Sequence, residues 1–179
     1  LAYFPNDIQP AEGSTGTPII NKSRNIRSAF THFLSDYSYF FDFMYWRLSS
    51  QHAKVFSELK TADLDQYKNQ EALSRHEEII SNFLKDAKAD DKKVVVLIFP
   101  YFAAWGKDYQ AQWVDDLMAS YFSLNGADVT IDLAPDLKGK TLQQLIANRF
   151  DSHPNEYVHA LTADKLFEKI VPLLKNTNP

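Results

Sequence analysis

The sequence predicts an α/β protein: a three-layer αβα sandwich in which helices cover both faces of a parallel sheet. The run VVVLIF, residues 94–99, is continuously β-branched and apolar, which is typical of a strand buried on both faces. Candidate strands alternate with helical stretches along the chain, and this favours parallel strands joined by right-handed crossovers. The chain has 179 residues, of which 45% are hydrophobic, so it can form one domain with a sizeable core.

The first part of the chain is predicted to hold one short strand and two long helices. Residues 1–4 form the apolar run LAYF before Pro-Asn-Asp, which indicates a strand and a turn. Residues 10–20 are rich in Pro, Gly, Ser and Thr and predict a loop. Helical spacing of apolar residues, among them Phe30, Phe33 and Tyr37, predicts a helix over 23–49. A second apolar stripe, which includes Phe83, predicts a helix over 65–89.

The second part of the chain continues the alternation of strands and helices. The expected elements are a strand at 94–99, a helix at 110–124, a strand at 128–133, a short helix at 141–148 and a helix at 155–174. In the helix at 110–124 the inward residues are predicted to be Trp113, Leu117, Met118 and Tyr121. Asn125-Gly126 is expected to end this helix, with the glycine at its C′ position. Phe167 is expected to be available for burial in the last helix.

Composition excludes several classes of function. With 19 basic and 23 acidic side chains interspersed and a net charge of -4, the sequence offers no basic face for nucleic acid. It contains no cysteine, so it has neither disulfides nor a thiolate site. His32, His52 and His76 are scattered on the expected helices and suggest no metal site. No cofactor is expected. Because no glycine-rich phosphate loop follows a strand, a flavodoxin-like nucleotide binder is the weakest alternative.

Four polar or aromatic segments follow the expected strands or precede the last helix. They are Pro5-Asn6-Asp7, Pro100 to Trp105, Ala134 to Asp136 and Asp151 to Asn155. Ligands of parallel sheets bind outside the carboxyl ends of the strands, so we expect these segments to meet at one site.

Residues 150–161, FDSHPNEYVHAL, provide the most informative pair in the sequence. A histidine beside a carboxylate at this edge suits the base and its orienting acid in a nucleophilic triad, here His153 and Asp151. Asn6 could donate a hydrogen bond to a developing oxyanion. The alternative roles are structural, since Asp-x-His pairs also cap helices and asparagines stabilise their own turns. His159 is expected to be packed or solvated and not catalytic.

These stretches resemble blocks of the SGNH (GDSL-type) esterase/lipase superfamily. DSHPNEYVHALTADKLF is similar to its last conserved block, and LAYFPNDI to its third, a strand that ends in Asn-Asp. VVVLIFP and DVTIDLAP occupy the places of its fourth and fifth strands. The resemblance implies a flavodoxin-like sheet, of which this chain holds the last three strands. It also implies ester hydrolysis or acyl transfer through an acyl-serine, with His153 as general base and acid, Asp151 as its orienter and Asn6 as an oxyanion donor.

The sequence departs from the family pattern in three ways. The spacing is Asp-x-His where Asp-x-x-His is commoner, and Phe150 stands where the acid would otherwise be. The Gly-Asp-Ser block and the block with the oxyanion glycine are absent from the 179 residues. Both precede the Asn-Asp block in the family, so we expect the nucleophile upstream of Leu1 and an inactive isolated chain. Residues 22–90 are expected to be a helical insertion.

Partners and substrate follow from the same resemblance. The expected partners are an ester substrate and the missing half of the domain, or else a second copy paired through LAYF. Tyr101, Phe102 and Trp105 are candidate substrate-wall residues. FTHFLSDYSYFFDFMYW holds nine aromatics in 17 residues, which predicts a helix buried against further protein. The alternatives to burial against further protein are an acyl-binding lip, a partner surface or a membrane-facing patch.

An alternative function is a non-catalytic α/β binding or assembly module that keeps the fold. Similar proteins favour a bacterial extracytoplasmic location.

Overall fold

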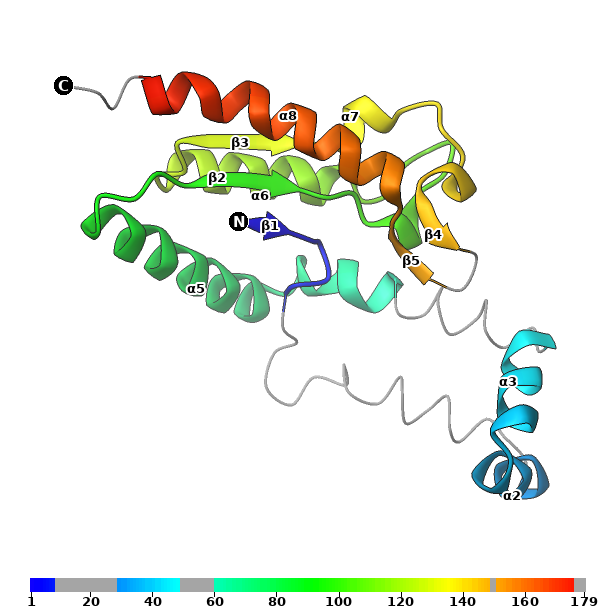
Figure 1. Cartoon of the computed structure of the whole chain (residues 1–179). Helices are drawn as coiled ribbons and strands as arrows, with labels where there is room; N and C mark the ends of the chain where they lie inside the picture. The colour runs from blue at the N-terminus through cyan, green and yellow to red at the C-terminus, as the bar shows by residue number, and fades with distance from the viewer. Residues whose placement is uncertain (9–28, 49–59, 149–150, 176–179) are drawn as a thin grey trace.

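The computed structural model describes residues 1–8, 29–48, 60–148 and 151–175. Its centre is a three-stranded parallel sheet in the order β1-β2-β3 (Figure 1). The strands are β1 (Ala2–Tyr3), β2 (Val95–Ile98) and β3 (Val129–Asp132). Tyr3 pairs with Ile98 and Ile98 with Asp132, so all three carboxyl ends lie at one edge. The predicted α/β class with a parallel sheet is therefore confirmed.

Helices make up most of the remaining described structure. In chain order they are α2 (Ala29–Tyr37), α3 (Tyr39–Leu48), α5 (Gln70–Ala89), α6 (Gln112–Leu124), α7 (Ala134–Leu137) and α8 (Glu156–Lys175). Residues 60–66 are also helical, and two single turns of 3₁₀ helix are η1 (Phe102–Ala104) and η2 (Leu142–Gln144). None of the described helices has the length and apolarity needed to cross a membrane.

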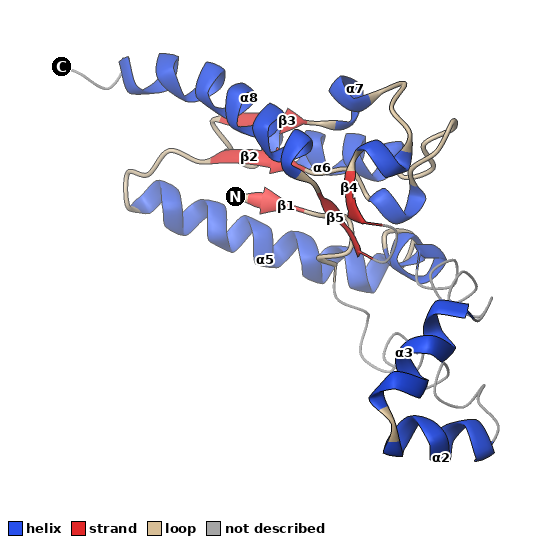
Figure 2. Cartoon of the chain, turned by 45° about the vertical axis from the view of Figure 1, so that its right-hand side comes forward, coloured by secondary structure: helices blue, strands red, loops and turns tan. Residues whose placement is uncertain are grey.

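The sheet is covered on both faces, as predicted. Helices α5 and α6 lie on one side of β2 and α8 lies on the other (Figures 1 and 2). The period-two alternation of β2 sends Val96 and Ile98 into the core with α5 and α6, and Leu97 and Phe99 into the core with α8. Each such buried side chain stabilises the fold by about 1.5–3 kcal/mol. This double burial is why the segment contains no polar residue.

Helix α6 ends at Asn125-Gly126, as predicted. Asn125 is its C-cap residue, and its backbone N–H donates to the carbonyl oxygen of Tyr121 at 3.0 Å. Gly126 follows with φ of 105°. That left-handed conformation favours glycine because it has no Cβ, so the chain can turn sharply towards β3.

The predicted helix over 23–49 is wrong within the described residues, because it is divided at Ser38. The Ser38 hydroxyl accepts a hydrogen bond from the backbone N–H of Phe41 at 3.2 Å, at the start of α3. A serine side chain competes well for such N–H groups at a helix start, so α2 ends at Tyr37 and α3 begins anew. Residues 23–28 and 49 lie outside the described part.

The predicted helix over 65–89 also begins differently. Residues 60–66 form a separate helix, and a turn follows at Tyr67 and Lys68. The side chain of Asn69 then accepts from the backbone N–H groups of Glu71 and Ala72, which makes it the N-cap of α5. Asparagine is among the strongest N-cap residues, so the new helix begins there.

The inward face of α6 is shifted by one residue from the predicted one. Met118 is buried as predicted, but Trp113 is 40% exposed, and Leu117 and Tyr121 are only partly buried. The buried residues are Val114, Asp115, Met118 and Phe122. The prediction followed the large aromatic residues, whereas the helix buries the face whose Val114, Met118 and Phe122 pack in one core with β1 and β2.

Several aromatic residues of the helices are exposed. Phe83 of α5 and Phe167 of α8 point away from the core. Phe30, Phe33 and Tyr37 of α2 are also exposed. Phe167 was expected to be available for burial, and that prediction is wrong.

Two short antiparallel strands lie where a helix and a loop were expected. After η2, β4 (Ile146–Asn148) pairs in antiparallel fashion with β5 (Asp151–Pro154), Ile146 opposite Pro154 and Asn148 opposite Asp151. Ile146 is buried in the core beneath α8. That contact is long-range, so the local sequence gave no sign of the strand, and the predictions of a helix at 141–148 and a loop at 151–155 are wrong.

Candidate functional site

The four predicted segments gather at the carboxyl edge of the sheet. The rings of Phe4 and Phe99 stack with centroids 4.7 Å apart, so the ends of β1 and β2 touch. Phe99 also approaches the ring of His159 on α8, with centroids 6.5 Å apart. The indole Nε1 of Trp105 donates to the carbonyl oxygen of Lys140 at 3.0 Å, which ties the segment after β2 to the segment after β3.

His153 lies in β5, directly before the turn into α8. Its side chain is exposed. The backbone of Asp151 lies in the same strand, but its side chain is outside the described residues, so the contact between the two side chains stays a prediction. Alternation along a strand puts residues 151 and 153 on the same face.

Asn155 fixes the corner that follows His153. Its backbone N–H donates to the carbonyl oxygen of Leu145 at 2.9 Å, and its Nδ2 donates to that of Gln144 at 3.0 Å. Its Oδ1 accepts from the backbone N–H of Val158 at 3.2 Å, which caps α8. One asparagine thus joins η2, β5 and α8, and so holds His153 at the sheet edge.

Asn155→Ala is expected to lower the free energy of unfolding by about 1–3 kcal/mol, because it removes a helix cap and leaves backbone groups without partners. Chemical denaturation monitored by circular dichroism measures this change. Asn82→Ala is the control, since Asn82 is exposed in the middle of α5 and its loss should change stability by less than about 0.5 kcal/mol. Equal effects of the two substitutions would remove the proposed role of Asn155.

The turn after β1 presents Asn6 to solvent. The Asp7 carboxylate accepts from the backbone N–H of Phe4 at 2.8 Å, and the Asp7 N–H donates to the carbonyl oxygen of Phe4 at 2.8 Å. Burial raises the pKa of Asp7, and the bond from Phe4 partly offsets this rise. Asp7 therefore stabilises the turn, and the exposed side chain of Asn6 is not needed for it.

The three predicted substrate-wall residues have different surroundings. Phe102 is buried in the core with Leu97 and Ile131, so little of its ring can line a site. The hydroxyl of Tyr101 donates to the Asp63 carboxylate at 2.5 Å, which anchors the tyrosine towards the 60–66 helix. Trp105 is partly exposed. Their contact with substrate stays a prediction.

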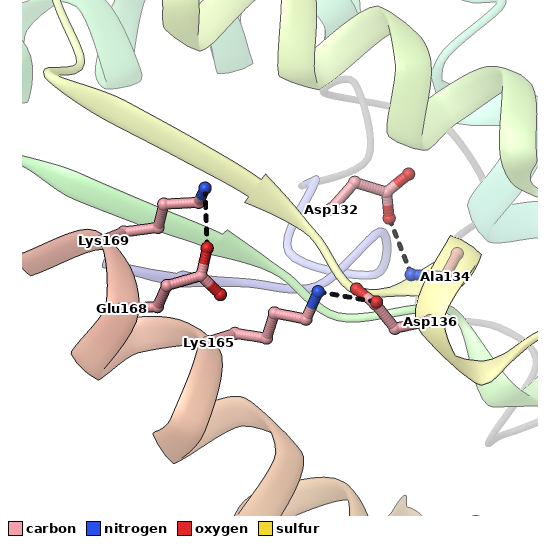
Figure 3. Close-up of polar contacts among 6 residues, drawn as sticks. All are labelled: Asp132, Ala134, Asp136, Lys165, Glu168 and Lys169. Atoms are coloured by element: carbon pink, nitrogen blue, oxygen red, sulfur yellow. Dashed lines mark hydrogen bonds and ion pairs between the residues drawn. The ribbon is translucent and has the colours of Figure 1, made fainter.

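The segment after β3 is fixed by polar contacts (Figure 3). The Asp132 carboxylate accepts from the backbone N–H of Ala134 at 2.9 Å. The ammonium group of Lys165 on α8 pairs with the Asp136 carboxylate of α7 at 2.7 Å. Both side chains of this pair are about one-third exposed, so water screens their attraction and its contribution to stability is small. Its effect is to hold α7 against α8 at the edge of the site.

A buried polar cluster beneath the sheet was missed by the sequence analysis. The hydroxyls of Tyr3 and Tyr67 are hydrogen-bonded to each other, and the Tyr3 hydroxyl lies 3.0 Å from Nε2 of His76. Burial raises the pKa of both tyrosines and lowers the pKa of His76, which favours neutral side chains. His76 lies four residues from both Ala72 and Ile80 on the buried face of α5. That helical spacing was the available signal.

Asp115 is the second residue that was missed. It is fully buried on α6, and neither of its carboxyl oxygens has a hydrogen-bond partner among the described residues. Burial raises its pKa to about 8, and the negative charges of Asp132 and Asp116 add to the rise. The nearby Tyr109 hydroxyl lowers this pKa by more than either of those charges raises it, although it does not reach hydrogen-bonding geometry. At neutral pH this carboxyl is therefore mostly protonated.

The described residues contain no candidate metal site, and comparisons with known proteins do not assign the chain to a family. Among residues 1–8, 29–48, 60–148 and 151–175, no group of three or more histidine and acidic side chains could hold a metal ion. No protein-family model, curated protein or solved structure matches the chain.

Proposed function

We propose that the chain is the C-terminal part of an SGNH-type serine hydrolase that cleaves carboxylic esters, with a flavodoxin-like sheet. The observation that carries the proposal is that His153 is exposed in β5, a strand that contacts η1 just after the carboxyl end of β2. Sites of parallel sheets lie at this edge. The stiff corner built on Asn155 supports a role that needs a well-placed imidazole.

In the proposed reaction a serine hydroxyl attacks the ester carbonyl while His153 takes the hydroxyl proton. His153 then gives this proton to the leaving alcohol, and a water molecule hydrolyses the acyl-serine by the same steps. Asp151 orients the imidazole, and Asn6 donates a hydrogen bond to the tetrahedral oxyanion. What supports Asn6 is its exposure after β1, on a turn that Asp7 holds.

The proposed nucleophile belongs to a Gly-Asp-Ser block that precedes the Asn-Asp block. The strands that carry it would pair with β1, which in the described structure pairs only with β2. The backbone groups of Leu1 and Tyr3 bond to β2, so those of the intervening Ala2 point to the open side. This edge supports the proposal that the rest of the domain docks there.

A serine-directed fluorophosphonate probe tests the proposed function. The polypeptide that carries both these residues and the proposed serine block should be labelled at one serine, and should hydrolyse short-chain p-nitrophenyl esters. Mass spectrometry locates the modified residue. If the protein shows neither labelling nor hydrolysis, the alternative of a non-catalytic α/β binding or assembly module replaces the enzyme.

A further inference from the structure

Helices α2 and α3 present aromatic rings where a surface helix normally presents polar residues. Phe30, Phe33, Tyr37, Tyr39 and Phe40 are between 57% and 96% exposed. On α2 the three exposed rings are spaced at i, i+3 and i+7, which places them on one face. Leu34, at i+4 from Phe30, lies on the same face and is partly buried. An apolar face of this kind on a helix is normally buried against other protein.

The two helices are also short. They have 9 and 10 residues, and isolated helices of fewer than about 12–15 residues are marginal in water. In both views they lie away from the sheet and its covering helices (Figures 1 and 2). Stable α2 and α3 therefore need cover on their outer aromatic faces.

The exposed aromatic area is the size of a protein interface. With about 200 Å² for each fully exposed ring, the five side chains present roughly 750 Å². A stable complex buries about 800 Å² on each partner, whereas the largest apolar patch of a typical monomer is about 300–600 Å². The area is thus sufficient for one protein partner.

The charge of the helices favours another protein over a lipid surface. The sequences of α2 and α3 contain one basic residue, Arg47, against two acidic ones, Asp36 and Asp42. Helices that bind membrane surfaces are usually rich in basic residues. The chain as a whole carries a net charge of -4, which disfavours anionic lipid.

We propose that the outer aromatic face of α2 and α3 is the interface of a two-fold dimer with a second copy of this chain. A two-fold interface brings the same patch of both subunits together, so the patch must be self-complementary. Aromatic rings meet this condition because they pack edge to face on one another. Phe33 and Tyr37 already form such a tilted pair, with centroids 4.8 Å apart.

Sedimentation-velocity ultracentrifugation of the full chain, from about 1 to about 100 µM, tests the proposal. The wild-type chain should be a dimer, and Phe40→Glu should raise its dissociation constant at least about 100-fold. Tyr39→Glu should do the same, and since this ring is 96% exposed, the substitution should leave the fold intact by circular dichroism. Phe167→Glu is the matched control: Phe167 is 72% exposed and Phe40 74%, but Phe167 lies on α8.

Ala2→Pro separates this interface from pairing through β1. Proline at Ala2 removes the outward N–H of the edge strand and should leave the α2–α3 dimer unchanged. A monomeric wild-type chain would overturn the proposal, whether or not it binds phosphatidylcholine vesicles. A dimer that survives Phe40→Glu and Tyr39→Glu, or that dissociates in Ala2→Pro or Phe167→Glu, would overturn it as well.

Discussion

His153→Gln is expected to lower kcat/KM for short-chain esters at least about 10³-fold, in the polypeptide that carries both this chain and the proposed serine block. Without the imidazole, the serine hydroxyl has no base and the leaving alcohol has no acid. Glutamine keeps a polar side chain of similar size but cannot exchange a proton near neutral pH. The fold should tolerate the change because His153 is exposed in β5, so the melting temperature should stay close to that of the wild type. Steady-state hydrolysis of p-nitrophenyl esters measures the loss.

Two comparisons make this result specific. His159→Gln alters an exposed histidine on the adjacent helix α8 and should leave kcat/KM within about threefold. Asn6→Ala should lower kcat by about 10²-fold with little change in KM, since an oxyanion donor acts mainly in the transition state. Unchanged turnover in His153→Gln would exclude the triad role. An equal loss in His159→Gln would point to damage of the helix and not to catalysis.

Asp115→Asn is expected to stabilise the protein at alkaline pH by roughly 3–5 kcal/mol. The carboxyl of Asp115 is buried with no hydrogen-bond partner among the described residues, and its pKa is raised to about 8. In the unfolded chain the same carboxyl ionises freely. Asparagine has nearly the same shape as aspartate but is always neutral. With asparagine at this position, folding at alkaline pH no longer requires the side chain to take up a proton or to bury a negative charge.

The pH window follows from the two pKa values of Asp115. The folded-state pKa of about 8 lies above the ordinary value of 3.8, so folding takes up a proton between these pH values. The contribution of Asp115 to stability is therefore greatest below about pH 4 and is lost as pH rises to 8, by up to about 1.4 kcal/mol per pH unit. Asp115→Asn should lack this pH dependence. The free energy of unfolding of Asp115→Asn minus that of the wild type should therefore increase from pH 4 to pH 8.

Denaturant unfolding of both proteins at pH 4, 6 and 8 gives the comparison. The control is Asp164→Asn, because Asp164 is an exposed carboxylate on a different helix, α8. Its loss should change stability by less than about 0.5 kcal/mol at every pH. If the difference in free energy of unfolding between the wild type and Asp115→Asn does not vary with pH, then Asp115 is ionised in the folded protein.

The fold depends partly on signals that lie within single segments. The run at 94–99 becomes the central strand β2 because six apolar residues in succession can be buried only between two layers of helix. Asn125 and Gly126 end α6 as predicted, since glycine adopts positive φ without steric cost. Asn155 begins α8 because its side chain caps the first turn. In each case the deciding interaction is local in sequence.

Other features were decided by contacts between distant segments. Residues 146–148 and 151–154 contain no strong strand pattern, and they pair as two strands because Ile146 packs beneath α8 in the folded chain. The orientation of α6 was mispredicted because Trp113 is the larger apolar residue, yet the face with Val114 and Asp115 contacts the sheet. Short strands and helix rotation depend on tertiary packing, which overrides local preference.

The candidate site divides in the same way. The sequence by itself determined that Asn6 lies in the turn after β1 and that His153 lies shortly before α8. Turns and helix caps depend on residues that are adjacent in the sequence, so they can be predicted from it. Only the tertiary structure decided that the buried cluster of Tyr3, Tyr67 and His76 forms, since its members come from β1, a turn and α5. Asp115 is buried for the same reason: tertiary packing covers it, and no local sequence pattern predicts that an ionisable residue lies in the core. The burial of a polar group depends on what packs around it, and that is a property of the whole fold.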